Sequence, residues 1–181
     1  MYLHNNPSPP TGDTSSQAVL PLGGTAPSAV TLYNYDTDRD ASPGLLIARG
    51  GTGSAETDTT EYQAWRTSAL ASGLTIKGAV RVLLWSGMKD FGPTTSGTVT
   101  VFLRHFDGAT HVEIAQGTLP AQAWQGGSGT WVVKAITIPG VDYSIPPGDY
   151  LELKIIVGAA ADDDMWFAYD TTSYNSRLEL P

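Results

Sequence analysis

Short segments in which apolar and polar residues alternate follow one another through the second half of the chain. In the segment 98–106, Val99, Val101 and Leu103 alternate with polar residues, as in a strand with one face in a core and one face in water. Glycine, proline or asparagine separates each segment from the next. The segments predicted as strands are 98–106, 111–119, 131–138, 150–157, 165–169 and 176–180. Their shortness and close spacing predict an all-β fold, an antiparallel β-sandwich.

The first half of the chain gives a weaker strand pattern. The segments predicted as strands are 18–22, 30–35, 45–48 and a longer one that begins at residue 74. In the long segment, Val82 and Leu84 point to one face while Leu83 and Trp85 point to the other. Both faces are apolar there, so we expect a loop or a second layer to cover part of the outer face.

The first sixteen residues have a different composition from the rest. Residues 4–16 are rich in proline and small polar residues, which predicts an extended arm rather than a regular element. We therefore divide the chain into an arm, 1–16, and a single sandwich domain, 17–181. The arm is either a linker or a segment that docks, on its own domain or on a neighbouring subunit. If it docks on a neighbour, the expected partners are further copies of the chain or neighbouring subunits of an assembly.

Composition limits the classes of partner. A length of 181 residues with 41% hydrophobic residues fits one domain with a sizeable core. The net charge is −8 and the ten basic residues are scattered, so we expect neither nucleic acid nor anionic lipid as a partner. No apolar stretch is long enough to insert into a membrane.

The expected location follows from the same composition. Few lysines and many small polar residues are typical of extracellular or particle-surface proteins. The start of the chain resembles no signal peptide, which suggests either an excised secreted domain or a protein used without secretion, as in a virion. There is no cysteine, which removes disulfides and thiolate chemistry.

One acidic loop has the spacing of a calcium site. Asp36, Asp38 and Asp40 alternate, and an irregular loop can wrap such carboxylates around a hard cation. The loop lacks the sixth-position glycine and the twelfth-position glutamate of an EF-hand, where Ala41 and Ile47 stand. The alternative is a solvated acidic loop with Asx turns. Calcium is the only cofactor that the residues suggest, as a structural ion.

Aromatic residues beside amides and carboxylates suggest a carbohydrate site, because sugar ring faces stack while hydroxyls find acceptors. Trp124 lies in a polar, glycine-rich segment, so the sequence leaves two alternatives for it, an exposed indole that stacks on a ligand or a side chain of the core. The other candidate ligand-binding residues are Tyr174 with Asn175, and Tyr33 with Tyr35 beside the acidic loop. The remaining four tryptophans are expected to fill or cap the core.

The part of the chain from Trp65 to Leu180 resembles a known family. The resemblance is carried by the segments Trp65-Arg-Thr-Ser-Ala-Leu, Leu74-Thr-Ile-Lys-Gly-Ala-Val-Arg-Val, Thr98-Val-Thr-Val-Phe-Leu-Arg and Ile145-Pro-Pro-Gly-Asp-Tyr-Leu-Glu-Leu-Lys-Ile. They resemble the galactose-binding-like jelly roll, as in the C-terminal domain of X-prolyl dipeptidyl peptidases and cocaine-esterase-type hydrolases. The resemblance implies a fold and no activity, since the nucleophile of those hydrolases lies in a separate α/β domain.

These observations leave two functional hypotheses. No Gly-x-Ser-x-Gly motif occurs in the 181 residues, so we expect no enzymatic activity from the chain itself. The opening residues Tyr2-Leu-His and the later Leu20-Pro21 also resemble small phage-particle and bacterial surface proteins. The first hypothesis is a non-catalytic structural or adhesive subunit of a surface assembly, bacterial or virion. The alternative is a carbohydrate-binding module of a larger secreted enzyme, with glycans as partners.

Overall fold

The structure of the chain is a computed structural model, which describes residues 1–6, 8, 19–35, 42–55, 61–89, 95–127 and 129–181. All the regular elements in these residues are β-strands, as the sequence predicts. The eleven strands are β1 (Tyr2–Leu3), β2 (Val19–Gly23), β3 (Leu45–Ile47), β4 (Tyr62–Arg66), β5 (Leu74–Met88), β6 (Ser96–Phe106), β7 (His111–Ala123), β8 (Val132–Ile145), β9 (Tyr150–Val157), β10 (Met165–Ala168) and β11 (Arg177–Glu179). Within these described ranges, no helix has the length and apolarity needed to cross a membrane.

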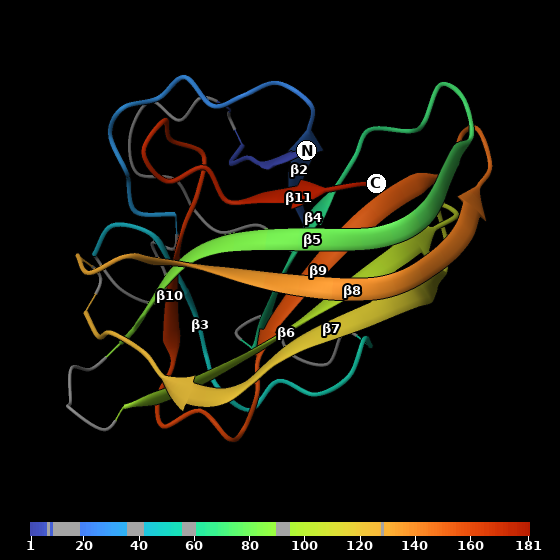
Figure 1. Ribbon diagram of the computed structural model, residues 1–181. Helices are drawn as coiled ribbons and strands as arrows, with labels where there is room; N and C mark the ends of the chain where they lie inside the picture. The colour runs from blue at the N-terminus through green and yellow to red at the C-terminus, as the bar shows by residue number, and fades with distance from the viewer. Residues whose placement is uncertain (7, 9–18, 36–41, 56–60, 90–94, 128) are drawn as a thin grey trace.

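The strands form two layers that enclose one core (Figure 1). One layer has the order β3-β10-β5-β11-β1, with β8 on the other edge of β5, and the second has the order β2-β4-β9-β6-β7. The pairing of β1 with β2 joins the two layers. All pairs of strands are antiparallel except β2 with β4. This arrangement is the predicted antiparallel β-sandwich.

The alternating residues of the long strands account for the core. Val82 and Leu84 of β5, Val101 of β6 and Leu153 of β9 are at most 2% exposed and belong to one cluster. The predicted strand 150–157 has the observed bounds of β9. By contrast, β8 continues to Ile145, beyond the predicted end, because an extra residue of β8 between Ile138 and Val141 shifts the register and the two strands stay paired beyond it.

The prediction of a strand at 30–35 is wrong. The only bridge there joins Asn34 to Gly44, where Tyr35 N–H and Gly44 N–H each donate to a backbone oxygen of the other segment. Val30, an apparent core position, is 81% exposed. A single bridge does not make a ladder, so an apolar segment without a neighbouring strand stays irregular.

The turn predicted at Asp107-Gly108 is present between β6 and β7. Gly108 has a φ of 99°, a left-handed value that favours glycine. The Asp107 carboxylate accepts hydrogen bonds from the backbone N–H groups of Thr110 and Ala109 and from the Thr110 hydroxyl. These bonds stabilise the ionised form and lower the pKa of Asp107 to about 2.

The predicted arm begins as part of the sandwich. Tyr2–Leu3 forms β1, which pairs with β2 on one side and with β11 on the other. Leu3 is 1% exposed, and His4 and Asn5 are also buried. The first residues of the chain therefore dock on their own domain, and residues 7 and 9–16 of the predicted arm lie outside the described residues.

Candidate functional site

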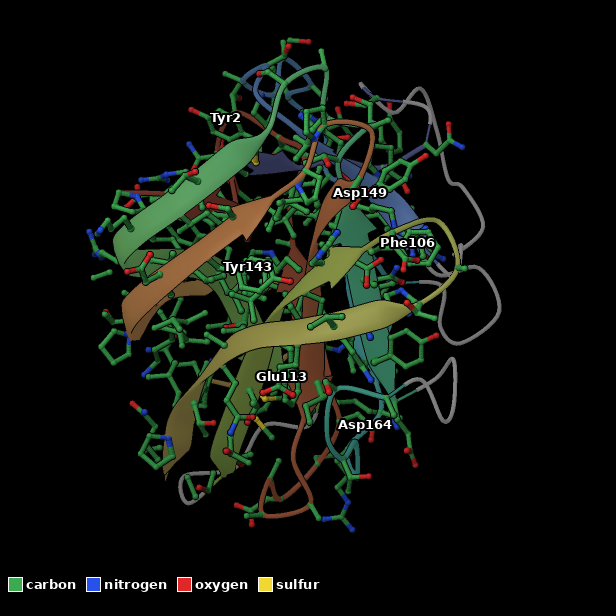
Figure 2. All side chains as sticks on the ribbon, turned by 90° about the vertical axis from the view of Figure 1, so that its right-hand side faces the viewer. Tyr2, Phe106, Glu113, Tyr143, Asp149 and Asp164 are labelled. Carbon is green, nitrogen blue, oxygen red and sulfur yellow. The ribbon has the colours of Figure 1, made fainter. Side chains whose placement is uncertain are left out.

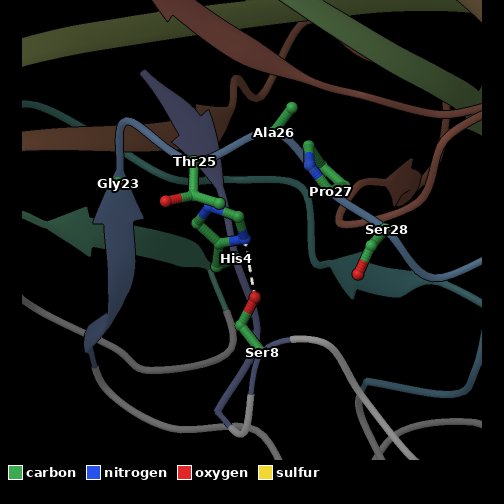
Figure 3. A pocket seen from close by; sticks show the side chains of 7 residues that line it. All are labelled: His4, Ser8, Gly23, Thr25, Ala26, Pro27 and Ser28. Atoms are coloured by element: carbon green, nitrogen blue, oxygen red, sulfur yellow. Dashed lines mark hydrogen bonds between the residues drawn. The ribbon is translucent and has the colours of Figure 1, made fainter.

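A pocket of about 300 Å³ lies beside the pair of strands β1 and β2. Figure 3 shows the side chains that line it, which are His4, Ser8, Gly23, Thr25, Ala26, Pro27 and Ser28. His4 follows β1 directly and Gly23 ends β2, so the pairing of these strands places them side by side. None of the lining residues is a lysine, arginine, aspartate or glutamate.

A buried carboxylate stands behind the pocket. Asp170 is 0% exposed and accepts hydrogen bonds from the His4 ring at 2.7 Å and from the Asn5 backbone N–H at 2.8 Å. Its φ of 55° lies in the left-handed region, where aspartate is one of the few tolerated residues besides glycine. Burial, together with the nearby Asp170 charge, raises the pKa of Tyr35. Asp170 therefore fixes the start of the chain against the loop that follows β10.

The contact with Asp170 fixes the tautomer of His4. An ionised carboxylate only accepts hydrogen bonds, so the His4 Nδ1 atom that lies 2.7 Å from Asp170 Oδ1 carries a proton. In the neutral ring, Nε2 is then an acceptor with a free lone pair. A Cβ atom built on Gly23 would lie 3.3 Å from Nε2 and 3.2 Å from Cδ2, so this edge of the ring faces the end of β2. In Figure 3 the second ring nitrogen lies on the side of the ring away from Ser8.

The Ser8, His4 and Asp170 side chains do not form a nucleophilic triad. Ser8 Oγ lies 2.7 Å from His4 Nδ1, the same nitrogen that contacts Asp170, and 3.2 Å from Asp170 Oδ1. A triad needs the hydroxyl on Nε2 and the carboxylate on Nδ1, so that the ring can take the hydroxyl proton. The cluster thus holds a histidine in place and leaves its second nitrogen available to the pocket.

A second histidine lies between the two layers at another end of the sandwich. His105 Nδ1 is 3.0 Å from the Tyr143 hydroxyl, and Nε2 is 2.8 Å from Asp149 Oδ2. Tyr143 belongs to β8 and Asp149 precedes β9, and both are labelled in Figure 2. Because both ring nitrogens have partners, this cluster links the layers and offers no free nitrogen to a ligand.

Charged residues are buried on the outer face of the second layer. Arg104 of β6 and Glu152 of β9 are register partners that form an ion pair, at 1% and 0% exposure. Arg66 of β4 donates from Nε to Glu152 at 2.6 Å and lies over the Phe106 ring. The backbone carbonyl of Ser54 accepts from Arg104 at 2.6 Å, so the segment before β4 covers the pair.

Two of the predicted ligand-binding aromatics lie in the core. Of the two alternatives for Trp124, the exposed indole is wrong, because Trp124 is 6% exposed, with the Lys134 ammonium 4.6 Å from its ring centroid. Tyr35 is 0% exposed and donates its hydroxyl to the Tyr169 backbone oxygen. Tyr33 is half-buried against the core. A residue's polar neighbours in sequence do not reveal which strands pack against its side chain.

Tyr174 lies instead in an aromatic cluster on the outer face of the first layer. Its ring centroid is 5.5 Å from that of Trp85 and 5.9 Å from that of Trp131. All three rings are half-buried, and Tyr174 comes from the loop before β11, so a loop covers part of this face as predicted. Asn175, the next residue, accepts a hydrogen bond from Arg177 at 3.1 Å.

The predicted calcium ligands cannot be placed. Asp36, Asp38 and Asp40 lie outside the described residues, and the calcium site stays a prediction. Among the residues that the structure does describe, no three histidine, aspartate or glutamate side chains are grouped as a metal site would need.

Comparison with known proteins identifies solved structures with a similar fold. No protein-family model and no curated protein matches the chain. An aminopeptidase from a marine sediment archaeon, Thaumarchaeota archaeon, matches with a TM-score of 0.66 at 11% identity, over 92% of this chain and 35% of its own. A CocE/NonD family hydrolase from Staphylococcus aureus matches with a TM-score of 0.61 at 13% identity, over 91% of this chain and 34% of its own. An α-amino acid ester hydrolase matches with a TM-score of 0.57 at 12% identity, over 67% of this chain and 25% of its own.

These matches establish a β-sandwich fold that is also found as part of larger hydrolase structures. The chain spans about a quarter to a third of their length. At this level of identity the likeness concerns the fold alone. The sequence resemblance covers Trp65 to Leu180, whereas the structural likeness covers about nine-tenths of the chain in two of the matches.

Sequence reasoning missed the pocket around His4. Asp170 lies 166 residues from His4, and neither residue belongs to a recognisable motif. One local signal was available: Gly23-Gly24 at the end of a predicted strand marks a place where another group approaches the backbone closely.

Proposed function

We propose that the chain is a non-catalytic, galactose-binding-like jelly-roll domain that works as an accessory module of a larger hydrolase-type enzyme. The observation that carries the proposal is the fold match to two hydrolase structures over 91–92% of this chain but only 34–35% of theirs. This favours the enzyme-module hypothesis over a subunit of a bacterial surface or a virion. In this role the module contributes binding and assembly, and the catalytic groups belong to the rest of the enzyme.

The outer face of the first layer supports the proposal as a contact surface for the catalytic part. We define this face by Leu83, Trp85, Trp131, Val133 and Tyr174. Trp85 and Val133 are register partners, so their side chains lie side by side on one face. Val133 is 46% exposed and the three aromatic rings are half-buried. Half-exposed aromatic and aliphatic side chains on one face are typical of a surface that packs against another domain.

The test starts from the parent polypeptide. An antibody against this domain should recover, from the source cells or their medium, a polypeptide about three to four times the 19.1 kDa of this chain. A fluorophosphonate probe for serine hydrolases should label the recovered polypeptide but not the isolated 181-residue chain. Recovery of the domain only as an unlabelled 19.1 kDa subunit, alone or in a particle, would reject the proposal.

A second arm of the same experiment examines the outer face. Val133→Asp in the parent enzyme should speed the loss of probe labelling on mild heating, because it places a charge in the contact with the catalytic part. Val112→Asp on β7 is the matched control, since Val112 is also 46% exposed but lies in the other layer. Equal behaviour of the two variants would show that the outer face is not the contact surface.

A further inference from the structure

We infer that the pocket beside β1 and β2 binds a neutral ligand with neighbouring hydroxyl groups, of the size of a sugar ring. His4 supplies the central recognition group. Its Nδ1 proton is held by Asp170, so Nε2 accepts a hydrogen bond and cannot donate one while the ring is neutral. A ligand that pairs with this nitrogen must therefore bring a hydrogen-bond donor.

The rest of the lining favours a hydroxyl as that donor. Thr25 and Ser28 carry hydroxyl groups that both donate and accept, as a row of sugar hydroxyls requires. Ala26 and Pro27 provide a small apolar surface between them, which suits the C–H face of a sugar ring. The pocket thus offers hydroxyl groups beside a small apolar surface, and a polyol or sugar presents both kinds of group.

The charges around the pocket exclude most charged ligands. No lysine or arginine lines it, and the buried Asp170 carboxylate behind His4 would repel an anion. The lining residues include no carboxylate that would attract an organic cation. A metal ion would find only one imidazole nitrogen, which is too few ligands for a stable site. A neutral ligand avoids both penalties.

Gly23 gives the inference a precise test. A Cβ atom at this position would press on the pocket edge of the His4 ring, at 3.2 Å from Cδ2 and 3.3 Å from Nε2. Gly24 offers a matched control, because a Cβ atom there meets nothing within 4 Å. Both changes add one methyl group to neighbouring residues and neither alters charge.

The experiment uses the isolated chain and follows the three histidine rings by ¹H–¹⁵N NMR. The probes are the methyl glycosides of galactose, glucose and mannose, and inositol, each titrated into the millimolar range. At least one probe should shift the His4 Nε2 signal saturably while His105 and His111 stay unchanged. Gly23→Ala should weaken that binding about tenfold, which corresponds to ~1.4 kcal/mol, and Gly24→Ala should leave it unchanged.

Three outcomes would overturn the inference. They are no saturable shift of His4 with any probe, a shift confined to His105 or His111, and equal affinity in the Gly23→Ala variant and the unchanged chain. Because the experiment needs no parent enzyme, its failure leaves the proposed accessory role untouched, and failure of that role leaves this binding test valid.

Discussion

Asp170 combines a left-handed backbone with a fully buried carboxylate. Its two oxygens accept from the His4 ring and the Asn5 backbone, so one side chain satisfies donors from the first residues of the chain. An unsatisfied buried donor costs about 1–3 kcal/mol. At the scale of single residues, this carboxylate is the group that holds the pocket together.

Replacing Asp170 should therefore show whether the hydrogen bonds or the backbone matter more. We expect Asp170→Ala to lower the free energy of unfolding by about 3 kcal/mol, since two buried donors lose their acceptor. Asp170→Asn keeps one acceptor oxygen and tolerates the left-handed backbone, so it should lose about half as much. Urea unfolding of both variants measures the difference. Equal losses would mean that the hydrogen bonds to Asp170 contribute little.

Single-residue environments could be predicted only where strand alternation determines them. Val82 and Leu84 are buried as the pattern of β5 predicts. Trp124 is buried despite its glycine-rich neighbours in sequence, because Gly97 of the adjoining strand leaves room for its ring. The contact of His4 with Asp170 depends on the pairing of β1 with the rest of the sheet, and no local pattern encodes that pairing.

The strands β6 and β9 carry charges on a face that alternation alone would leave to solvent. Arg104 and Glu152 occupy outward positions, but residues 53–55 cover them, with carbonyl oxygens directed at Arg104 and Lys154. The alternation therefore predicts correctly that these residues lie on strands and on the face away from the core. Their burial depends on the segment that covers that face. Alternation also misleads at 30–35, where the tyrosines alternate but only a single bridge forms, so the pattern predicts a strand that has no ladder to join.

A double replacement tests this buried pair. Glu152→Ala should lower the free energy of unfolding by about 3–5 kcal/mol, because it leaves the buried Arg104 charge without its carboxylate. Adding Arg104→Met to Glu152→Leu should recover most of that loss, since apolar residues of similar size often replace a buried ion pair without penalty. Thermal and urea unfolding of the single and double variants measure the coupling. A double variant no more stable than Glu152→Ala would contradict this account of the pair.

Across the whole molecule, β1 connects the two layers. The fold class, the positions of most later strands along the chain and a sizeable core follow from the sequence pattern. The role of the first residues does not, because a strand of two residues carries no alternation and its partners β2 and β11 come from distant parts of the chain.

The importance of β1 can be measured through Leu3. Leu3→Ala should lower the free energy of unfolding by about 2–5 kcal/mol, the usual cost of truncating a buried leucine. Val30→Ala is the control, because Val30 is 81% exposed and its truncation should change stability by less than about 0.5 kcal/mol. If both variants unfold at the same urea concentration, the first strand contributes nothing to the core.

The pairing of β1 with β11 also sets a condition on synthesis. Among the described strands, β1 is translated before the others and β2 follows it, whereas β11, which closes the other side of β1, is translated last of these eleven. Until then a nascent chain on the ribosome carries an open sheet edge along β1 and β5. Such an edge can pair with a neighbouring nascent chain. Slow translation of the last strands, or crowding of ribosomes on one message, should therefore favour intermolecular pairing over the native closure.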